Sequence, residues 1–235
     1  MSGNAGDVRT FGAVIAIDGP SGAGKSTLTG LLAERLGYLH IDTGAMFRAV
    51  ALAAKREKIA IDDEEALALL CRGLNISFAR SGRSCRVVMN GEDVSEDIRR
   101  PDISLLTSTV SALKSVREIL LERQREMGRA GGVVLEGRDI GTVVFPDAEV
   151  KFFLTASAAE RGRRRYLELL QKGEDVSLER TIAEVAQRDE QDERREHAPL
   201  RKAPDAIDID SSELSIEEVL ALMEKKIKER LAAGG

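Results

Sequence analysis

Nine consecutive residues have the types and spacing that bind phosphate. They read Gly19-Pro20-Ser21-Gly22-Ala23-Gly24-Lys25-Ser26-Thr27 and fit the pattern G-x-x-x-x-G-K-[ST]. Glycines let backbone N–H groups close around a phosphate, and the N-terminus of a following helix adds about half a positive charge. Lys25 can then reach the β- and γ-phosphates. The Ser26 hydroxyl is the expected protein ligand for Mg²⁺, whose other ligands would be phosphate oxygens and water.

The segments around this loop predict the elements that must hold it. An apolar run, Val14 to Ile17, precedes the loop and an amphipathic stretch, Leu28 to Leu36, follows it, which indicates strand, loop and helix. Similar runs predict strands at 14–18, 38–42, 133–136, 150–155 and 206–210. Helical patterns predict helices at 26–36, 45–58, 62–72, 103–112, 116–129, 157–171, 177–195 and 215–231. Short apolar strands that alternate with helices favour a parallel sheet covered on both faces.

Two helix starts carry a capping-box signature, in which a serine is followed three residues later by a glutamate. Ser115 with Glu118 predicts that a helix restarts there, and Ser215 with Glu218 predicts the start of the last helix.

One stretch, residues 74–94, departs from the α/β pattern. Apolar residues alternate with polar ones at Leu74, Ile76 and Phe78, and the stretch contains the turn pair Asn90-Gly91. This alternation predicts a small antiparallel meander. We interpret it as an insertion that carries substrate contacts, and a surface hairpin without that role is the alternative.

Composition limits the class of protein. The 235 residues carry 35 basic and 40 acidic side chains, so a net charge of −5 gives no general attraction to nucleic acid or anionic membranes. Cys71 and Cys85 fit no metal-binding pattern and are interpreted as free thiols in a reducing compartment. The sequence has no signal-peptide pattern and no apolar stretch long enough to cross a membrane. We therefore expect a cytoplasmic monomer without nucleic-acid or membrane partners.

Three further segments narrow the choice among proteins with such a loop. They are Asp42-Thr43-Gly44-Ala45-Met46-Phe47-Arg48, Gly137-Arg138-Asp139-Ile140-Gly141-Thr142-Val143-Val144-Phe145-Pro146-Asp147, and Arg188-Asp189-Glu190-Gln191-Asp192-Glu193-Arg194-Arg195. A GTPase would carry Asn-Lys-x-Asp, and the sequence has no Asn-Lys pair, which disfavours that class. With these segments the sequence resembles the bacterial cytidylate kinases, and the resemblance extends in order from about Val14 to Val219.

The resemblance assigns eight residues to the acceptor nucleotide, CMP or dCMP: Thr43, Arg48, Ser108, Arg117, Asp139, Arg188, Asp192 and Arg195. It implies that Thr43 and Arg48 hold the monophosphate, and the planar guanidinium of arginine suits this role. It places Ser108, Arg117 and Asp139 near the pyrimidine and its sugar. A hydroxyl or carboxylate can accept from the cytosine amine, while an arginine can donate to N3 and O2.

The same resemblance assigns Arg188 and Asp192 to the pentose and Arg195 to the phosphate region. The first two residues are four apart on a predicted helix, so an ordinary surface ion pair is the alternative. Glu136 ends a predicted strand. It could orient a metal-bound water, and it could equally cap the turn that follows.

The densest positive charge lies in Arg161-Gly162-Arg163-Arg164-Arg165. Arg161, Arg164 and Arg165 share a helical face, and in related kinases arginines of this region close over the transferred phosphoryl group. With Lys25 and Arg138 they form the expected catalytic set. A solvated helix face and an RNA-binding patch are the alternatives.

These observations predict an α/β P-loop kinase with a five-stranded parallel sheet flanked by helices, an inserted antiparallel meander and a short helical lid. Within one domain, 1–235, we expect a core at 14–42, 133–157 and 199–231, an acceptor region at 43–130 with the meander at 74–94, and a lid at 158–176. The expected reaction transfers the γ-phosphoryl group of ATP to CMP or dCMP, with Mg²⁺ as cofactor. Phosphorylation of UMP or dTMP is one alternative. A regulatory or RNA-associated module that binds ATP without catalysis is another.

Overall fold

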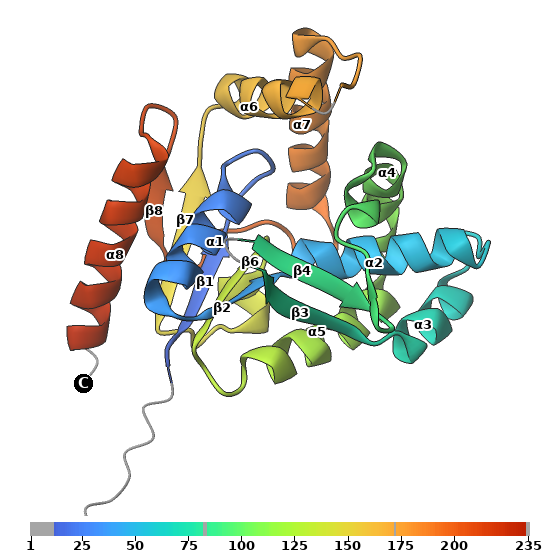
Figure 1. The fold of residues 1–235 in the computed structure, drawn as a ribbon, viewed down its shortest axis with the longest axis horizontal. Coiled ribbons are helices and arrows are strands. Elements are labelled where there is room, and N and C mark those ends of the chain that lie inside the picture. Colours follow the sequence, from blue (N-terminus) through green and yellow to red (C-terminus); the bar gives the residue numbers. More distant parts are fainter. Residues whose placement is uncertain (1–11, 82–83, 172, 234–235) are drawn as a thin grey trace, which may run out of the picture.

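A central parallel sheet organises the protein and confirms the predicted fold class (Figure 1). The computed structural model describes residues 12–81, 84–171 and 173–233. The strands are β1 (Val14–Asp18), β2 (Leu39–Asp42), β6 (Val133–Gly137), β7 (Val150–Thr155) and β8 (Ile207–Asp210). Their order is β2-β6-β1-β7-β8, with every neighbouring pair parallel. The strand with the phosphate-binding pattern at its end, β1, therefore lies in the middle of the sheet.

Helices cover both faces of this sheet, as the apolar strands predicted. The helices are α1 (Lys25–Leu36), α2 (Thr43–Arg56), α3 (Glu64–Gly73), α4 (Pro101–Val110), α5 (Lys114–Gly128), α6 (Ala158–Gln171), α7 (Leu178–Arg194) and α8 (Ile216–Ala233). Ile15 and Ile17 of β1 pack in one buried cluster with α1 and α8. Ala16, between them, packs in another cluster with α5. Successive residues of β1 thus bury their side chains on opposite faces.

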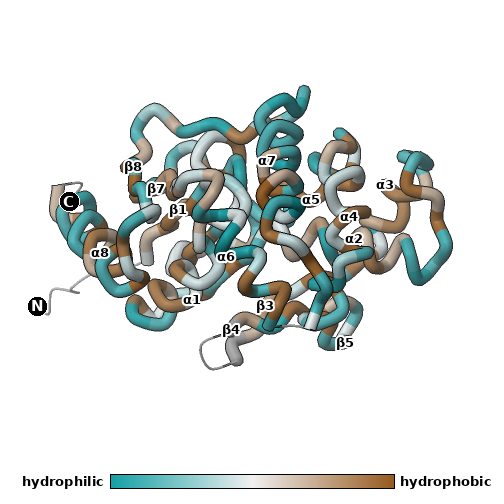
Figure 2. The backbone as a smooth tube through the Cα atoms, turned by 90° about the horizontal axis from the view of Figure 1, so that it is seen from above, coloured by the Kyte–Doolittle hydropathy of each residue, from teal (hydrophilic) through white to brown (hydrophobic). Residues whose placement is uncertain are grey.

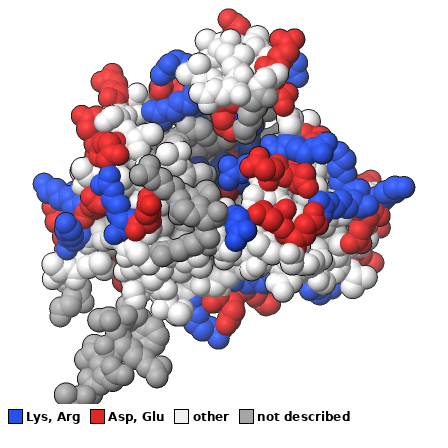
Figure 3. Space-filling model, in the orientation of Figure 1, with Lys and Arg blue, Asp and Glu red and all other residues white. Residues whose placement is uncertain are grey.

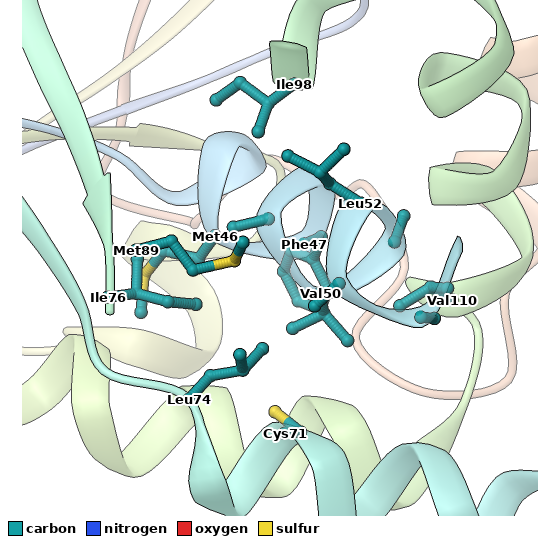
Figure 4. Close-up of a cluster of buried hydrophobic side chains, with 14 of the residues drawn as sticks. Met46, Phe47, Val50, Leu52, Cys71, Leu74, Ile76, Met89, Ile98 and Val110 are labelled. Carbon is teal, nitrogen blue, oxygen red and sulfur yellow. The ribbon is translucent and has the colours of Figure 1, made fainter. Parts of the chain in front are cut away.

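A second core lies beside the sheet, where α2 is surrounded by α3, α4, α5 and the meander (Figures 1 and 4). Met46, Phe47 and Val50 of α2 are buried at its centre. The meander contributes Ile76 and Met89 to the same cluster. Because its apolar side chains are buried in this core, the meander is part of the packed structure. Its role in substrate binding stays a prediction.

The meander itself has three antiparallel strands, β3 (Ile76–Ser81), β4 (Ser84–Met89) and β5 (Glu92–Asp93), in that order. Asn90 and Gly91 have φ angles of 52° and 86°. Positive φ at both positions is what the tight turn of an Asn-Gly hairpin requires. The antiparallel insertion predicted from the alternating pattern is confirmed.

α6 and α7 pack against each other and lie on one side of the molecule, at the carboxyl end of the sheet (Figure 1). Hydrophilic residues predominate along α7 (Figure 2). The contact between the two helices is close at Gly162, where a Cβ atom would lie 2.4 Å from Cγ1 of Ile182.

Two local features differ from the sequence prediction. The capping box at Ser115 is wrong, because α5 begins at Lys114 and the Ser115 N–H donates to Glu64 Oε1 of α3 (3.1 Å). The second box is confirmed, since the Ser215 N–H donates to Glu218 Oε2 (2.8 Å) and the Glu218 N–H donates to Ser215 Oγ (3.3 Å).

The other difference is a turn of π-helix, Ile140–Val144, in a segment for which no element was predicted. Asp18, the last residue of β1, accepts the N–H groups of Ile140 (2.8 Å) and Gly141 (2.7 Å). These partners are far away in sequence, so local pattern could not predict the turn.

No helix in the described residues is long and apolar enough to cross a membrane.

Candidate functional site

The phosphate-binding loop joins the end of β1 to the start of α1 and depends on glycine at three points. Gly19, Gly22 and Gly24 have φ angles of 149°, 76° and 89°, which L side chains rarely adopt. At Gly19, a Cβ atom would also lie 2.0 Å from the carbonyl oxygen of Leu154. In the described chain no side chain caps the N-terminus of α1. Its first N–H groups therefore remain available to an anion.

The ammonium group of Lys25 lies buried against this loop. Its Nζ donates to the carbonyl oxygens of Gly19 (2.7 Å) and Pro20 (2.6 Å), and 6 % of the residue is exposed. Burial, together with the positive charge of Arg138, lowers the pKa of Lys25 to about 7. A phosphate group at this position would raise the pKa of Lys25 again, because an adjacent anion favours the charged amine.

Next to Lys25, the Ser26 hydroxyl donates to Glu136 Oε2 at 2.8 Å. The other carboxylate oxygen, Oε1, lies 2.8 Å from Nε2 of His40 on the neighbouring strand β2. Burial opposes protonation of His40, but the hydrogen bond to Glu136 raises its pKa above the ordinary value. Glu136 is 4 % exposed. Its carboxylate is thus directed at Ser26 and His40, and its backbone carbonyl accepts the Thr43 hydroxyl (2.7 Å).

The residues around Ser26 fit a magnesium ion. A hydroxyl and a carboxylate offer the hard oxygen ligands that Mg²⁺ prefers. Among the described residues, no group of three or more His, Cys, Asp and Glu side chains could hold a metal by itself. An ion at Ser26 would therefore depend on phosphate oxygens and water for its remaining ligands, which is how Mg²⁺ is usually held with nucleotides.

Three arginine–carboxylate pairs lie beyond the loop. They are Arg48–Asp42 (2.6 Å), Arg117–Asp139 (2.6 Å) and Arg138–Asp192 (2.7 Å). All six side chains are at most 21 % exposed, so their charges interact in a partly desolvated environment. The guanidinium of Arg117 also lies 5.3 Å from the centre of the Phe47 ring. These pairs fix the direction of arginine side chains that would otherwise be flexible.

Arg188 of α7 lies among other arginines. Burial, together with the charges of Arg138, Arg48 and Arg165, lowers the pKa of Arg188 to about 10 against the opposing effect of Asp192. In Figure 3, basic side chains gather at the margin of a central hollow below the α6–α7 pair. Like charges repel one another at close range, so a cluster of this kind favours binding of an anion such as phosphate.

Comparison with known proteins identifies the family. A family model described as "Cytidylate kinase" matches residues 15–229. A protein named cytidylate kinase from Geobacter sp. (strain M21) is 70% identical over 227 residues, which are 97% of this chain and 97% of that protein. The chain belongs to the cytidylate kinase family.

A second cytidylate kinase, from Geobacter sulfurreducens, is 68% identical over 93% of this chain and 94% of that protein. Among solved structures, an uncharacterized protein from Eubacterium ventriosum is 12% identical and has a TM-score of 0.50, covering 92% of this chain and 98% of that one. This last likeness concerns the fold alone. The family resemblance inferred from the sequence motifs is confirmed.

The structure brings most of the residues that the family resemblance assigned to the acceptor close together. Arg195 lies 3.6 Å from Asp192, and its pKa is lowered by burial and by Arg117. Asp192 is engaged by Arg138 and Arg195, so a simple surface pair between Arg188 and Asp192 does not describe it.

The two hydroxyl residues of the predicted set, Thr43 and Ser108, lie near backbone carbonyls. The Thr43 hydroxyl donates to a backbone carbonyl, as described above. Ser108 lies on α4, and its carbonyl accepts the Ser111 hydroxyl (3.1 Å). Arg117 donates to the Ser111 carbonyl (3.0 Å), which places Ser108 one turn of helix from that contact.

The three arginines predicted for the lid have different surroundings. Arg164 donates to the carbonyl of Ser211 (2.6 Å), and Arg165 pairs with Glu168 (2.8 Å). Arg161 is buried and pairs with Asp189. In this conformation, Arg161 is thus enclosed by protein, while Arg164 and Arg165 are only partly buried.

Sequence reasoning did not single out two acidic residues of the site. Asp18 ends β1 and is 4 % exposed, and burial raises its pKa to about 7. Asp189 falls inside a quoted motif but received no role. A carboxylate that directly ends an apolar strand, as Asp18 does, was an available signal, because parallel strands place ligand sites at their carboxyl ends. Nothing in the spacing predicted the partner of Asp189.

Proposed function

We propose that this protein transfers the γ-phosphoryl group of ATP to CMP or dCMP and produces ADP with CDP or dCDP. Besides family membership, the position of Arg138 is the main structural support for this proposal. Arg138 pairs with Asp192, one of the residues assigned to the acceptor nucleotide. Among neighbouring charges, Arg138 also has the largest effect on the pKa of Lys25 in the phosphate loop. One guanidinium is therefore close to both nucleotide sites, as transfer between two bound nucleotides requires.

Positioning and charge neutralisation supply the catalysis. A phosphate oxygen of the acceptor would attack the γ-phosphorus in line with the departing ADP, so the protein needs no nucleophile of its own. We assign Lys25, Arg138, Arg164 and Arg165 to the charge that develops on the transferred group. Ser26 would bind Mg²⁺ directly, and Glu136 would orient a water beside it. The ion supplies neutralisation of the phosphate oxygens when it is bound.

The acceptor would lie among the arginine–carboxylate pairs. We assign Arg48 and Thr43 to its phosphate, with Arg195 nearby, and Arg188 with Asp192 to the pentose. Asp139 and Ser108 can accept from the cytosine amine, and Arg117 can donate to the ring. Uracil reverses the polarity of two of these contacts, so it would leave buried groups without partners.

The division of the chain predicted from the sequence is part of the proposal. We propose a core at 14–42, 133–157 and 199–231, an acceptor region at 43–130 and a lid at 158–176. We also propose that the enzyme acts in the cytoplasm as a monomer, without nucleic-acid or membrane partners.

Release of ADP from ATP and Mg²⁺, measured with CMP, dCMP, UMP, dTMP, AMP and GMP in parallel, tests the proposal. We expect the two cytidine nucleotides to be preferred by at least about tenfold, because unpaired buried polar groups cost about 1–3 kcal/mol each. Preference for UMP or dTMP would overturn the acceptor assignment. ATP binding without ADP release with any acceptor would favour the non-catalytic alternative.

A further inference from the structure

A buried ion pair holds Ser21 of the phosphate loop through the two peptide units that flank it. Asp189 Oδ1 of α7 accepts the Ser21 N–H at 3.2 Å, and Arg161 Nη1 of α6 donates to the Ser21 carbonyl at 3.1 Å. Arg161 and Asp189 also pair directly with each other, and each residue is 8 % exposed. Arg161 Nε donates to the Ala156 carbonyl (2.8 Å), which fixes the guanidinium further.

These contacts determine where the loop can present its N–H groups. A peptide unit is planar and trans, so its N–H points away from its C=O. Arg161 holds the Ser21 carbonyl and thereby orients the N–H of Gly22 in the same peptide towards the opposite side. The backbone also packs closely here, because a Cβ atom at Gly22 would lie 2.9 Å from the Arg161 carbonyl oxygen.

Helix α7, which carries Asp189, also reaches the residues assigned to the acceptor. Asp189 contacts the loop, and three residues further along α7 the carboxylate of Asp192 pairs with Arg138. Arg188 lies beside Asp189 on this helix, among the arginines described above. A single rigid element thus contacts the loop for the donor and the arginine cluster for the acceptor.

We propose that Arg161 and Asp189 are positioning residues, which set the orientation of the phosphate loop through Ser21 and couple it through α7 to the acceptor site. The coupling half of this inference depends on the proposed function, and the loop half does not. Arg161 therefore acts on the phosphate indirectly, in contrast to its sequence-based assignment to the catalytic lid.

Asp189→Asn is the sharpest test, because the amide keeps an oxygen for the Ser21 N–H and removes the charge that pairs with Arg161. Arg161→Lys keeps the charge and loses the fixed fork of donors. The matched control is Arg180→Ala, which removes the exposed pair with Glu184 on the same helix. For each variant, calorimetry would measure binding of the β,γ-imido analogue of ATP with Mg²⁺, binding of CMP alone, and binding of CMP with the analogue present.

We expect both site variants to bind the ATP analogue about tenfold or more weakly, the typical effect of losing a charged hydrogen bond. CMP alone should bind within about twofold of the wild-type affinity, and any gain in CMP affinity from the analogue should shrink. The control should match wild type in all three measurements.

A merely structural role for the pair would give a different result. The melting temperature would fall while the folded variants bound the ATP analogue within about twofold of wild type, and this outcome would overturn the proposal. If Asp189→Asn does not fold, Arg161→Lys decides by the same criterion. A further outcome is that CMP binds neither wild type nor variants while the site variants bind the ATP analogue more weakly than wild type does. That result would support the role of the pair in the loop and would reject CMP as the acceptor.

Discussion

The hydroxyl of Ser26 donates to the carboxylate of Glu136 at 2.8 Å, across a sequence separation of 110 residues. This bond ties the first turn of α1 to the end of β6. The phosphate loop and α1 follow β1, the strand that pairs with β6 in the sheet. Glu136 Oε2 therefore contacts the expected magnesium ligand, which is the arrangement that a role in orienting a metal-bound water requires.

Glu136→Gln tests this relationship. The amide can still accept from Ser26, but it loses the charge that would orient a metal-bound water. We expect the Mg²⁺ concentration for half-maximal ADP release to rise about tenfold or more, as for other outer-shell partners of a metal. Glu149→Gln is the control, because that exposed carboxylate accepts from Val14 at the other end of the sheet. An unchanged Mg²⁺ requirement would contradict the assignment.

Arg117→Ala tests the acceptor site separately from the ATP site. It leaves the buried Asp139 without its 2.6 Å partner and removes the donor assigned to the cytosine ring. We expect KM for CMP to rise about 10- to 100-fold while the affinity for ATP stays unchanged, because a hydrogen bond to a charged group contributes about 1.5–3 kcal/mol. Lys114→Ala, on the exposed side of the same helix, should leave both values as they are. Equal losses for ATP and CMP would point to general misfolding instead.

Asp18 predicts a pH dependence of stability. Burial raises its pKa from 3.8 to about 7, although the N–H groups of Ile140 and Gly141 favour the charged form. Between these values the folded protein holds a proton that the unfolded chain has released. The stabilisation is therefore fully present below about pH 4 and is lost as the pH rises through about 7.

Asp18→Asn lacks this titration. From about pH 5 to about pH 8, we expect the free energy of unfolding of wild type to fall by about 1–4 kcal/mol relative to the variant. Urea unfolding across this range measures the difference, and Asp147→Asn, at an exposed carboxylate, provides the control. Parallel pH profiles for wild type and Asp18→Asn would show that Asp18 is charged in the folded protein.

Gly162→Ala should separate α6 from α7. The new Cβ atom would lie 2.4 Å from Cγ1 of Ile182 and 2.9 Å from its Cα atom, so the backbones must shift. We expect a loss of about 1–3 kcal/mol in the free energy of unfolding, as for other overpacked positions. Gly73→Ala, with open space around it, should be neutral or slightly stabilising. A Gly162→Ala variant as stable as wild type would mean that the two helices adjust freely.

The sequence by itself determined the sheet, the meander and the family. A buried parallel strand must be apolar throughout, an Asn-Gly pair favours one kind of tight turn, and a phosphate loop needs glycine where backbone approaches an anion. These constraints act within a few neighbouring residues. Strand β1, the Asn90-Gly91 turn and the Gly19-to-Thr27 loop could therefore be predicted from the sequence alone.

Only the tertiary structure decided which charges meet. Asp192 pairs with Arg138 at a separation of 54 residues, and Arg161 pairs with Asp189 at a separation of 28. At Ser115, Glu64 from another helix replaced the local cap that the sequence predicted. The strength and choice of an ion pair depend on distance and burial, and both are set by how distant helices and strands pack.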